Sequence, residues 1–72
     1  MRYRDIQRGE TYCGRLVTSI YPTGSDGAGP GSQQVSAADD IVAYQDFREA
    51  VRTRCTAREF AAWATQQERK SA

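Results

Sequence analysis

The sequence predicts an α+β fold: a small antiparallel sheet of about four strands, closed into a barrel or left as a curved sheet, followed by a C-terminal α-helix. Two observations lead to this prediction. β-branched and aromatic residues are concentrated near the start of the chain, and a helix-capping pattern opens its last part. With 72 residues, the chain has room for a single small domain that spans 1–72.

Residues 10–21 predict a β-hairpin. The segments 10–13 and 16–21 are rich in residue types that favour strands, and Gly14 between them suits a turn. Strict alternation in the second strand would place Leu16, Thr18 and Ile20 on one side of the sheet and Val17, Ser19 and Tyr21 on the other. Pro22 ends this strand because proline has no N–H for further pairing.

Residues 22–38 predict a flexible loop rich in glycine and proline. Four glycines and two prolines fall within 22–31, which prevents regular secondary structure there. No Gly-Lys-Ser or Gly-Lys-Thr follows, so the glycines do not have the pattern of a phosphate-binding loop. The loop offers a contact surface for a partner, because binding groups often gather on such loops.

Residues 36–55 fit two structures. In the first, 40–45 and 50–55 are strands joined by a turn, with Arg52 and Arg54 facing outward and Val51, Thr53 and Cys55 facing inward. In the second, Ser36 caps a helix that continues to Cys55, which gives an N-terminal β-hairpin plus two helices. We favour the strands because two helices would have to pack on a lone hairpin, which is not stable by itself.

Residues 56–69 predict an α-helix with a well-defined start. Thr56 and Glu59 have the spacing of a capping box, in which the threonine oxygen accepts a hydrogen bond from the Glu59 N–H. An apolar stripe at helical spacing follows, formed by Ala57, Phe60, Ala61 and Ala64, with Trp63 at its edge. We expect Phe60 and Trp63 to anchor this helix to the sheet.

The charge and the residue types that are missing restrict the function. The chain has 10 basic and 9 acidic side chains, a net charge of +1, and no histidine. Because histidine is the commonest general base and metal ligand, we predict no enzyme activity, no metal site and no cofactor. The N-terminus has no apolar signal segment, and no apolar run is long enough to span a membrane, so we expect a cytoplasmic protein.

Cys13 and Cys55 are the two cysteines of the chain. In a reducing compartment they are expected to be free thiols that are buried as small apolar residues. Whether they ever pair with each other stays open at this point.

Four arginines in the second half of the chain form the candidate binding site. If 50–55 is a strand, Arg52 and Arg54 share its outer side, while Arg48 precedes it and Arg58 lies in the first turn of the helix. Guanidinium groups gathered in this way bind phosphates or carboxylates. Tyr44, if it lies on the neighbouring strand with its ring exposed, would stack on a base or on an arginine. The alternative is a solvated surface that nearby acidic residues neutralise.

These features lead to two functional hypotheses. The favoured one is a non-enzymatic interaction module that binds a protein partner through the loop at 22–38 or through the four arginines. The alternative is an accessory or regulatory protein that binds nucleic acid with the same arginines, although a net charge of +1 is low for such a protein. The small core also leaves the formation of a homodimer open.

The order of four short motifs is similar to that of a group of bacterial domains. The motifs are Ile6-x-x-Gly9-x-x-Tyr12, the segment 16–20, Val42-Ala43-Tyr44-x-Asp46 and Thr56-x-x-Glu59-Phe60. In this order they resemble uncharacterised short SH3-like-barrel proteins of actinobacteria and their phages. The resemblance implies an SH3-like fold and a non-enzymatic role, and it implies no particular functional residues. The interaction module of the favoured hypothesis would then be encoded by a phage or a plasmid.

Overall fold

A computed structural model describes residues 1–24, 31–48 and 51–71 of the chain. A short 3-10 helix, η1 (Tyr3–Asp5), precedes the strands β1 (Thr11–Tyr12), β2 (Arg15–Tyr21), β3 (Ile41–Asp46) and β4 (Val51–Thr56). The helix α1 (Ala57–Ser71) follows β4 directly. The expected α+β fold with a C-terminal helix is therefore confirmed.

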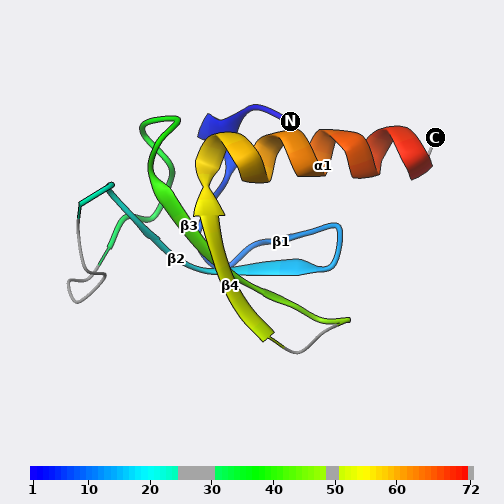
Figure 1. The fold of residues 1–72 in the computed structure, drawn as a ribbon, viewed down its shortest axis with the longest axis horizontal. Coiled ribbons are helices and arrows are strands. Elements are labelled where there is room, and N and C mark those ends of the chain that lie inside the picture. Colours follow the sequence, from blue (N-terminus) through cyan, green and yellow to red (C-terminus); the bar gives the residue numbers. More distant parts are fainter. Residues whose placement is uncertain (25–30, 49–50, 72) are drawn as a thin grey trace.

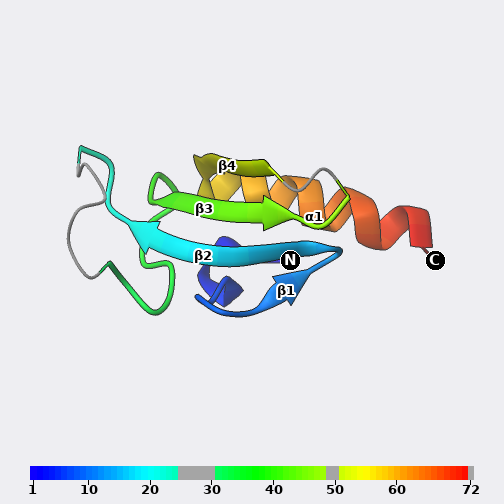
Figure 2. The ribbon, with the colours of Figure 1, turned by 90° about the horizontal axis from the view of Figure 1, so that it is seen from below.

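The strands form one antiparallel sheet in the order β1-β2-β3-β4, so each strand pairs with its neighbours in sequence and β1 and β4 lie at the edges. Figure 1 shows α1 along one side of this open sheet. Figure 2 shows the sheet from below, from the side away from α1, so that α1 lies behind it. The alternative of a hairpin plus two helices is wrong, because residues 41–46 and 51–56 are strands. The pairing of 41–46 with β2, and of 51–56 with 41–46, supplies hydrogen bonds that override the helical propensity of this segment.

The hairpin between β1 and β2 turns at Cys13 and Gly14. Both residues have positive φ angles, 52° and 90°, and they separate the opposed pair Tyr12 and Arg15. Two central residues with positive φ are the mark of a type I′ turn, whose twist matches that of the strands it joins. Cys13 is exposed on this turn. The expectation that it is buried was wrong, because a two-residue turn leaves no neighbour to cover its side chain.

A β-bulge in β2 changes which of its residues face α1. The register with β3 shifts between Val17 and Ser19, so Val17 pairs with Tyr44 and Ile20 pairs with Val42. Val17 and Ile20 therefore lie on the same side of the sheet, although strict alternation predicted opposite sides. The reason is that one extra residue in a strand reverses the alternation beyond it.

The core lies between this side of the sheet and α1. Val17, Ile20, Val42 and Tyr44 contribute from the strands, and they pack in one cluster with Ala57, Phe60 and Ala61 of α1. Ile6 and Val35 complete the cluster from segments outside the sheet. The predicted apolar stripe of the helix is confirmed, since Ala57, Phe60, Ala61 and Ala64 are all buried.

Residues 31–38 are held against the rest of the domain. Val35 is only 3% exposed, and its N–H donates to the Ile6 carbonyl at 3.1 Å. The Ser32 N–H donates to the Ile20 carbonyl at 2.7 Å. The predicted range of the flexible loop, 22–38, therefore extends too far toward the C-terminus, because the buried Val35 fixes residues 31–38 to the core. Residues 25–30 of that loop lie outside the described residues.

The junction of β4 and α1 confirms the predicted helix start. The Glu59 N–H donates to Thr56 Oγ1 at 3.2 Å, as expected for an N-cap threonine. Cys55 packs against the core from one side of this cap, and Phe60 is fully buried on the other. This pair has the positions of a hydrophobic staple, which fixes the angle at which the strand enters the helix.

Candidate functional site

One face of the sheet is not covered by α1 (Figure 2). Directly opposed residues of an antiparallel sheet point to the same side, so the printed register assigns each side chain to a face. We call the side away from α1 the open face. Its residues are Thr11 of β1, Leu16, Ser19 and Tyr21 of β2, Ile41, Ala43 and Gln45 of β3, and Arg52, Arg54 and Thr56 of β4.

Arg52 and Arg54 lie together on the open face, as the sequence predicted. Both are exposed, and they line a shallow depression of about 270 Å³ together with Tyr21, Ala43 and Thr53. Arg54 Nη1 donates to the hydroxyl of Tyr21 at 3.4 Å. This hydrogen bond raises the pKa of Arg54 above its ordinary value, so the guanidinium stays charged. Arg54 is thereby directed across Ala43 toward β2.

Tyr44 does not belong to this site. It lies on the side of the sheet that faces α1, and it is only 7% exposed, with its ring 5.5 Å from that of Phe60. The expectation of an exposed ring was wrong, because Tyr44 pairs with Val17 and Thr53 on the core side of β3. Arg15 covers this ring instead, with its guanidinium carbon 4.5 Å from the ring centroid. The stacking partner of Tyr44 is therefore within the domain.

Arg48 lies beyond the end of β3. Its N–H donates to Asp46 Oδ1 at 2.8 Å, and its side chain is exposed. This hydrogen bond is the main reason why the pKa of Asp46 is lowered, and Arg15 adds to the effect from the other carboxylate oxygen. Arg48 does not line the depression that holds Arg52 and Arg54.

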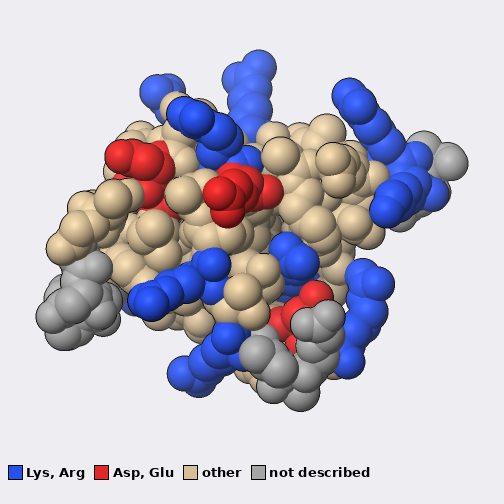
Figure 3. Space-filling view, in the orientation of Figure 1, with Lys and Arg blue, Asp and Glu red and all other residues tan. Residues whose placement is uncertain are grey.

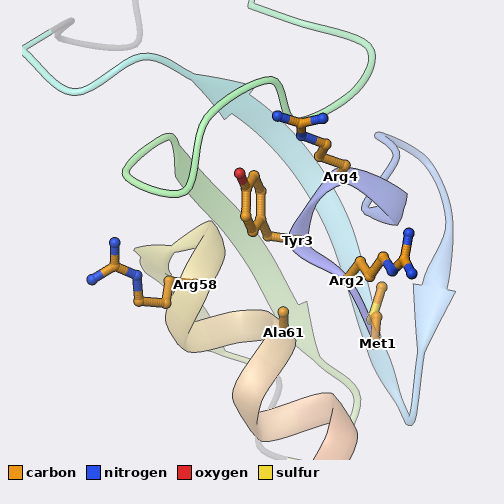
Figure 4. A pocket seen from close by; sticks show the side chains of 6 residues that line it. All are labelled: Met1, Arg2, Tyr3, Arg4, Arg58 and Ala61. Carbon is orange, nitrogen blue, oxygen red and sulfur yellow. The ribbon is translucent and has the colours of Figure 1, made fainter.

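Arg58 is separated from the other predicted arginines. It lines a different cavity, of about 350 Å³, that lies between η1 and the first turns of α1. The other residues that line it are Met1, Arg2, Tyr3, Arg4 and Ala61. In Figure 4 the guanidinium groups of Arg2, Arg4 and Arg58 point in three different directions rather than toward one another. The structure thus separates the four predicted arginines: Arg52 and Arg54 lie together, Arg58 lines this cavity, and Arg48 lines neither.

Basic and acidic groups are mixed on the surface. Figure 3 shows blue side chains scattered around this view, with a few red ones between them. Among the described residues, the recorded ion pairs are those of the N-terminal amine with Glu68 and of Arg15 with Asp46. Neither Arg52 nor Arg54 is in an ion pair in the described part of the chain.

The described residues contain no group of three or more acidic or cysteine side chains that is arranged to hold a metal ion. The buried carboxylate of Asp40 has a structural role, since its Oδ2 accepts hydrogen bonds from the N–H and hydroxyl of Ser36 and from the Ala37 N–H. Burial raises the pKa of Cys55 to about 11, and Glu59 adds to this shift, so the thiol stays protonated near neutral pH. No described helix has the length and hydropathy needed to span a membrane.

Two residues that shape these surfaces, Tyr21 and Arg15, were not predicted from the sequence. Tyr21 is placed on the open face by the bulge, and a bulge leaves no clear pattern in a single sequence. Arg15 lies on the core side, where its guanidinium covers the rings of Tyr44 and Trp63. The signal that could have identified Arg15 is its position opposite Asp46. This position is known only once the register of β2 and β3 is known.

Comparisons with protein-family models, with curated proteins and with solved structures gave no match to this chain. The resemblance to SH3-like proteins of actinobacteria and their phages therefore stays a prediction.

Proposed function

We propose that this protein is a non-enzymatic interaction module that binds a protein partner through the open face, with Arg52 and Arg54 contacting carboxylates of that partner. One observation carries the proposal: a sheet face left uncovered by α1 holds two exposed arginines that are paired with no carboxylate among the described residues. We expect the module to act in the cytoplasm.

The composition of the open face supports a protein partner. Leu16, Ile41 and Ala43 are half-buried and give the face an apolar centre, and the two arginines flank it at the β4 edge. Protein interfaces combine an apolar centre with arginine in this way, because arginine offers several donors on a weakly hydrated planar group. The partner surface that fits is apolar with acidic residues on one side.

Nucleic acid binding has less support on the same face. Tyr44, the side chain expected to stack on a base, is buried against Phe60. Tyr21 is 9% exposed, so its ring offers little surface for stacking. Proteins that bind single strands rely on exposed aromatic rings beside their cations. The described open face has the cations without the rings.

The test is a pull-down from the native host with three baits. These are the wild-type domain, the double variant Arg52→Glu/Arg54→Glu, and a control, Arg69→Glu/Lys70→Glu, that makes the same charge change at the C-terminal end of α1. We expect a specific protein to be retained by the wild type and by the control and to be lost from the double variant. Equal retention by all three baits would refute the proposal.

The nucleic acid alternative is tested with the same variants. Anisotropy of labelled DNA and RNA oligonucleotides is measured at low and at physiological salt. Binding that weakens steeply with salt and is lost in Arg52→Glu/Arg54→Glu would favour the alternative. We expect no specific retention of either oligonucleotide.

A further inference from the structure

The hydrogen bonds around β4 determine which of its backbone N–H and C=O groups point to its outer edge. In an antiparallel pair, hydrogen-bonded and non-hydrogen-bonded residue pairs alternate. The Ala57 N–H donates to the Asp40 carbonyl at 2.7 Å, and Asp40 and Ala57 form the next position beyond the opposed pair Ile41 and Thr56. Asp40 with Ala57 is therefore a hydrogen-bonded pair, and the alternation runs from there along β3 and β4.

This alternation turns the backbone of two arginines outward. Cys55 and Thr53 direct their N–H and C=O groups toward β3, whereas Arg54 and Arg52 direct theirs away from it. The other side of β3 gives an independent check. The Phe47 N–H donates to the Gly14 carbonyl at 3.0 Å, which turns the backbone of Gln45 toward β2 and leaves its opposed residue, Arg52, unbonded to β3.

Both views show β4 at the margin of the sheet (Figures 1 and 2). Among the described residues, no strand pairs with its outer edge. The edge thus offers two N–H groups and two C=O groups, from Arg52 and Arg54, to an added strand. The side chains of these same two residues point to the open face, so the hydrogen-bonding groups and the positive charges belong to the same positions.

We propose that an extended segment of the partner adds to β4 as an antiparallel strand and carries acidic residues at two alternate positions. This rests on the proposed function and specifies how the partner is held. Each acidic residue lies opposite Arg52 or Arg54 in a hydrogen-bonded pair, so that its carboxylate meets the guanidinium on the open face. The residue between the two acids points to the α1 side, where it lies beside Thr53.

A second copy of this chain is a poor occupant of the same edge. If two β4 strands pair around a two-fold axis at Thr53, each Arg52 lies opposite the Arg54 of the other copy. Registers centred on Arg52 or on Arg54 place identical arginines opposite each other. Like charges directly opposed across strands are unfavourable. Edge strands often carry cations that block self-pairing in this way. An acidic partner strand places opposite charges, not like charges, across from Arg52 and Arg54. Charge complementarity therefore favours an acidic strand over a second copy of this chain.

The test uses end-capped nine-residue peptides and fluorescence anisotropy. The probe is Thr-Val-Thr-Glu-Thr-Glu-Thr-Val-Thr, and its control has the same composition with the two glutamates adjacent, which sends their carboxylates to opposite faces of a strand. We expect the control to bind about fivefold more weakly, since one opposed charge pair is lost. A third peptide carries N-methyl groups on both glutamates, and a fourth carries them on the threonines that flank the first glutamate. Only methylation of the glutamates should abolish binding, because among the methylated residues only the glutamates direct their N–H groups toward β4.

The chain itself offers a matched pair of variants. Arg52→Pro and Arg52→Ala remove the same charge, but only the proline removes the outward N–H. We expect Arg52→Pro to bind the alternating probe more weakly than Arg52→Ala. Circular dichroism melting checks that both variants fold. If Arg52→Pro does not fold, the N-methylated peptides provide the test of strand addition. In the wild type, amide exchange of Arg52 and Arg54 should slow when the probe binds.

Failure of this inference is distinguishable from failure of the proposed function. If both glutamate arrangements and both methylated peptides bind equally and Arg52→Glu/Arg54→Glu abolishes their binding, the open face binds acidic peptides without strand addition, and the inference is refuted. If the double variant still retains the partner in the pull-down, the proposed function itself is refuted.

Discussion

Arg15 connects three elements through one side chain. Its guanidinium carbon lies 3.6 Å from the centroid of the Trp63 ring in α1 and 4.5 Å from that of Tyr44 in β3. Its Nε also lies 3.4 Å from Oδ2 of Asp46. With a side chain only 20% exposed, Arg15 acts as a core-covering residue rather than as a surface charge. An arginine can do this because its stem is apolar and its flat head stacks on rings.

We expect Arg15→Ala to destabilise the domain by about 1–3 kcal/mol, since both the ring contacts and the packing of the stem are lost. Urea denaturation measures this change. A double-mutant cycle with Trp63→Leu should show a coupling of about 1 kcal/mol between the two side chains. Arg69→Ala, at the exposed end of α1, is the control and should change stability little. A stability equal to wild type in Arg15→Ala would contradict this account.

The two thiols differ in their surroundings, and this difference is testable. Cys13 is exposed, whereas Cys55 is half-buried and burial raises its pKa to about 11. Because the thiolate is the reactive form, an aromatic disulfide reagent at pH 8 should modify Cys13 quickly and Cys55 slowly. Unfolding in urea should make the two rates similar. Fast modification of the folded Cys13→Ser variant would show that Cys55 is not protected.

The raised pKa also sets the sign of a pH effect on stability. The folded state favours the protonated thiol, so the contribution of Cys55 is present below its ordinary pKa of 9.0 and is lost as the pH rises through about 11. The free energy of unfolding of wild type relative to Cys55→Ala should therefore fall over this range.

At the scale of elements, the boundary between β4 and α1 depends on one side chain. Thr56 ends the strand, and its hydroxyl accepts the Glu59 N–H at 3.2 Å. Thr56→Ala should lower the free energy of unfolding by about 1 kcal/mol, because an N–H at the helix start loses its partner. Thr56→Ser keeps the oxygen and should restore most of this loss. Equal stabilities of the two variants in urea denaturation would contradict the capping role.

The strands 41–46 and 51–56 show how pairing decides an element. Alanine, arginine and glutamate in this region favour a helix by propensity, and the apolar residues also fit helical spacing. Opposed to β2, however, Val42 and Tyr44 enter the core beside Val17 and Ile20. Local sequence could therefore only rank strand above helix, since the deciding contacts come from residues more than twenty positions away.

At the scale of the whole molecule, the segment 31–38 closes the core from outside the sheet. Val35 packs in the same cluster as Ile6 and Phe60, and its N–H bonds the Ile6 carbonyl. The segment is irregular in sequence and structure, yet it excludes water from one end of the core. Stability of this domain thus depends on a part of the chain that composition alone assigns to a flexible loop.

Val35→Ala should therefore reduce the free energy of unfolding by about 2 kcal/mol, the usual cost of a cavity left by a buried branched side chain. Gln33→Ala is the control, since Gln33 is exposed and contributes its backbone carbonyl to Arg8. Thermal melting of both variants measures the effect. If Val35→Ala and Gln33→Ala have the same melting temperature, the segment 31–38 does not contribute to the core.

The sequence by itself determined the features that depend on near neighbours. The turn at Gly14, the cap at Thr56 and the apolar stripe of α1 all follow from spacings of a few residues. Only the tertiary structure decided the rest. The bulge that carries Tyr21 to the open face, the burial of Tyr44 beneath Arg15, the separation of Arg58 from the other arginines and the anchoring of Val35 all depend on the register between distant segments. Register is set by which side chains fill a shared core, and no local pattern contains that information.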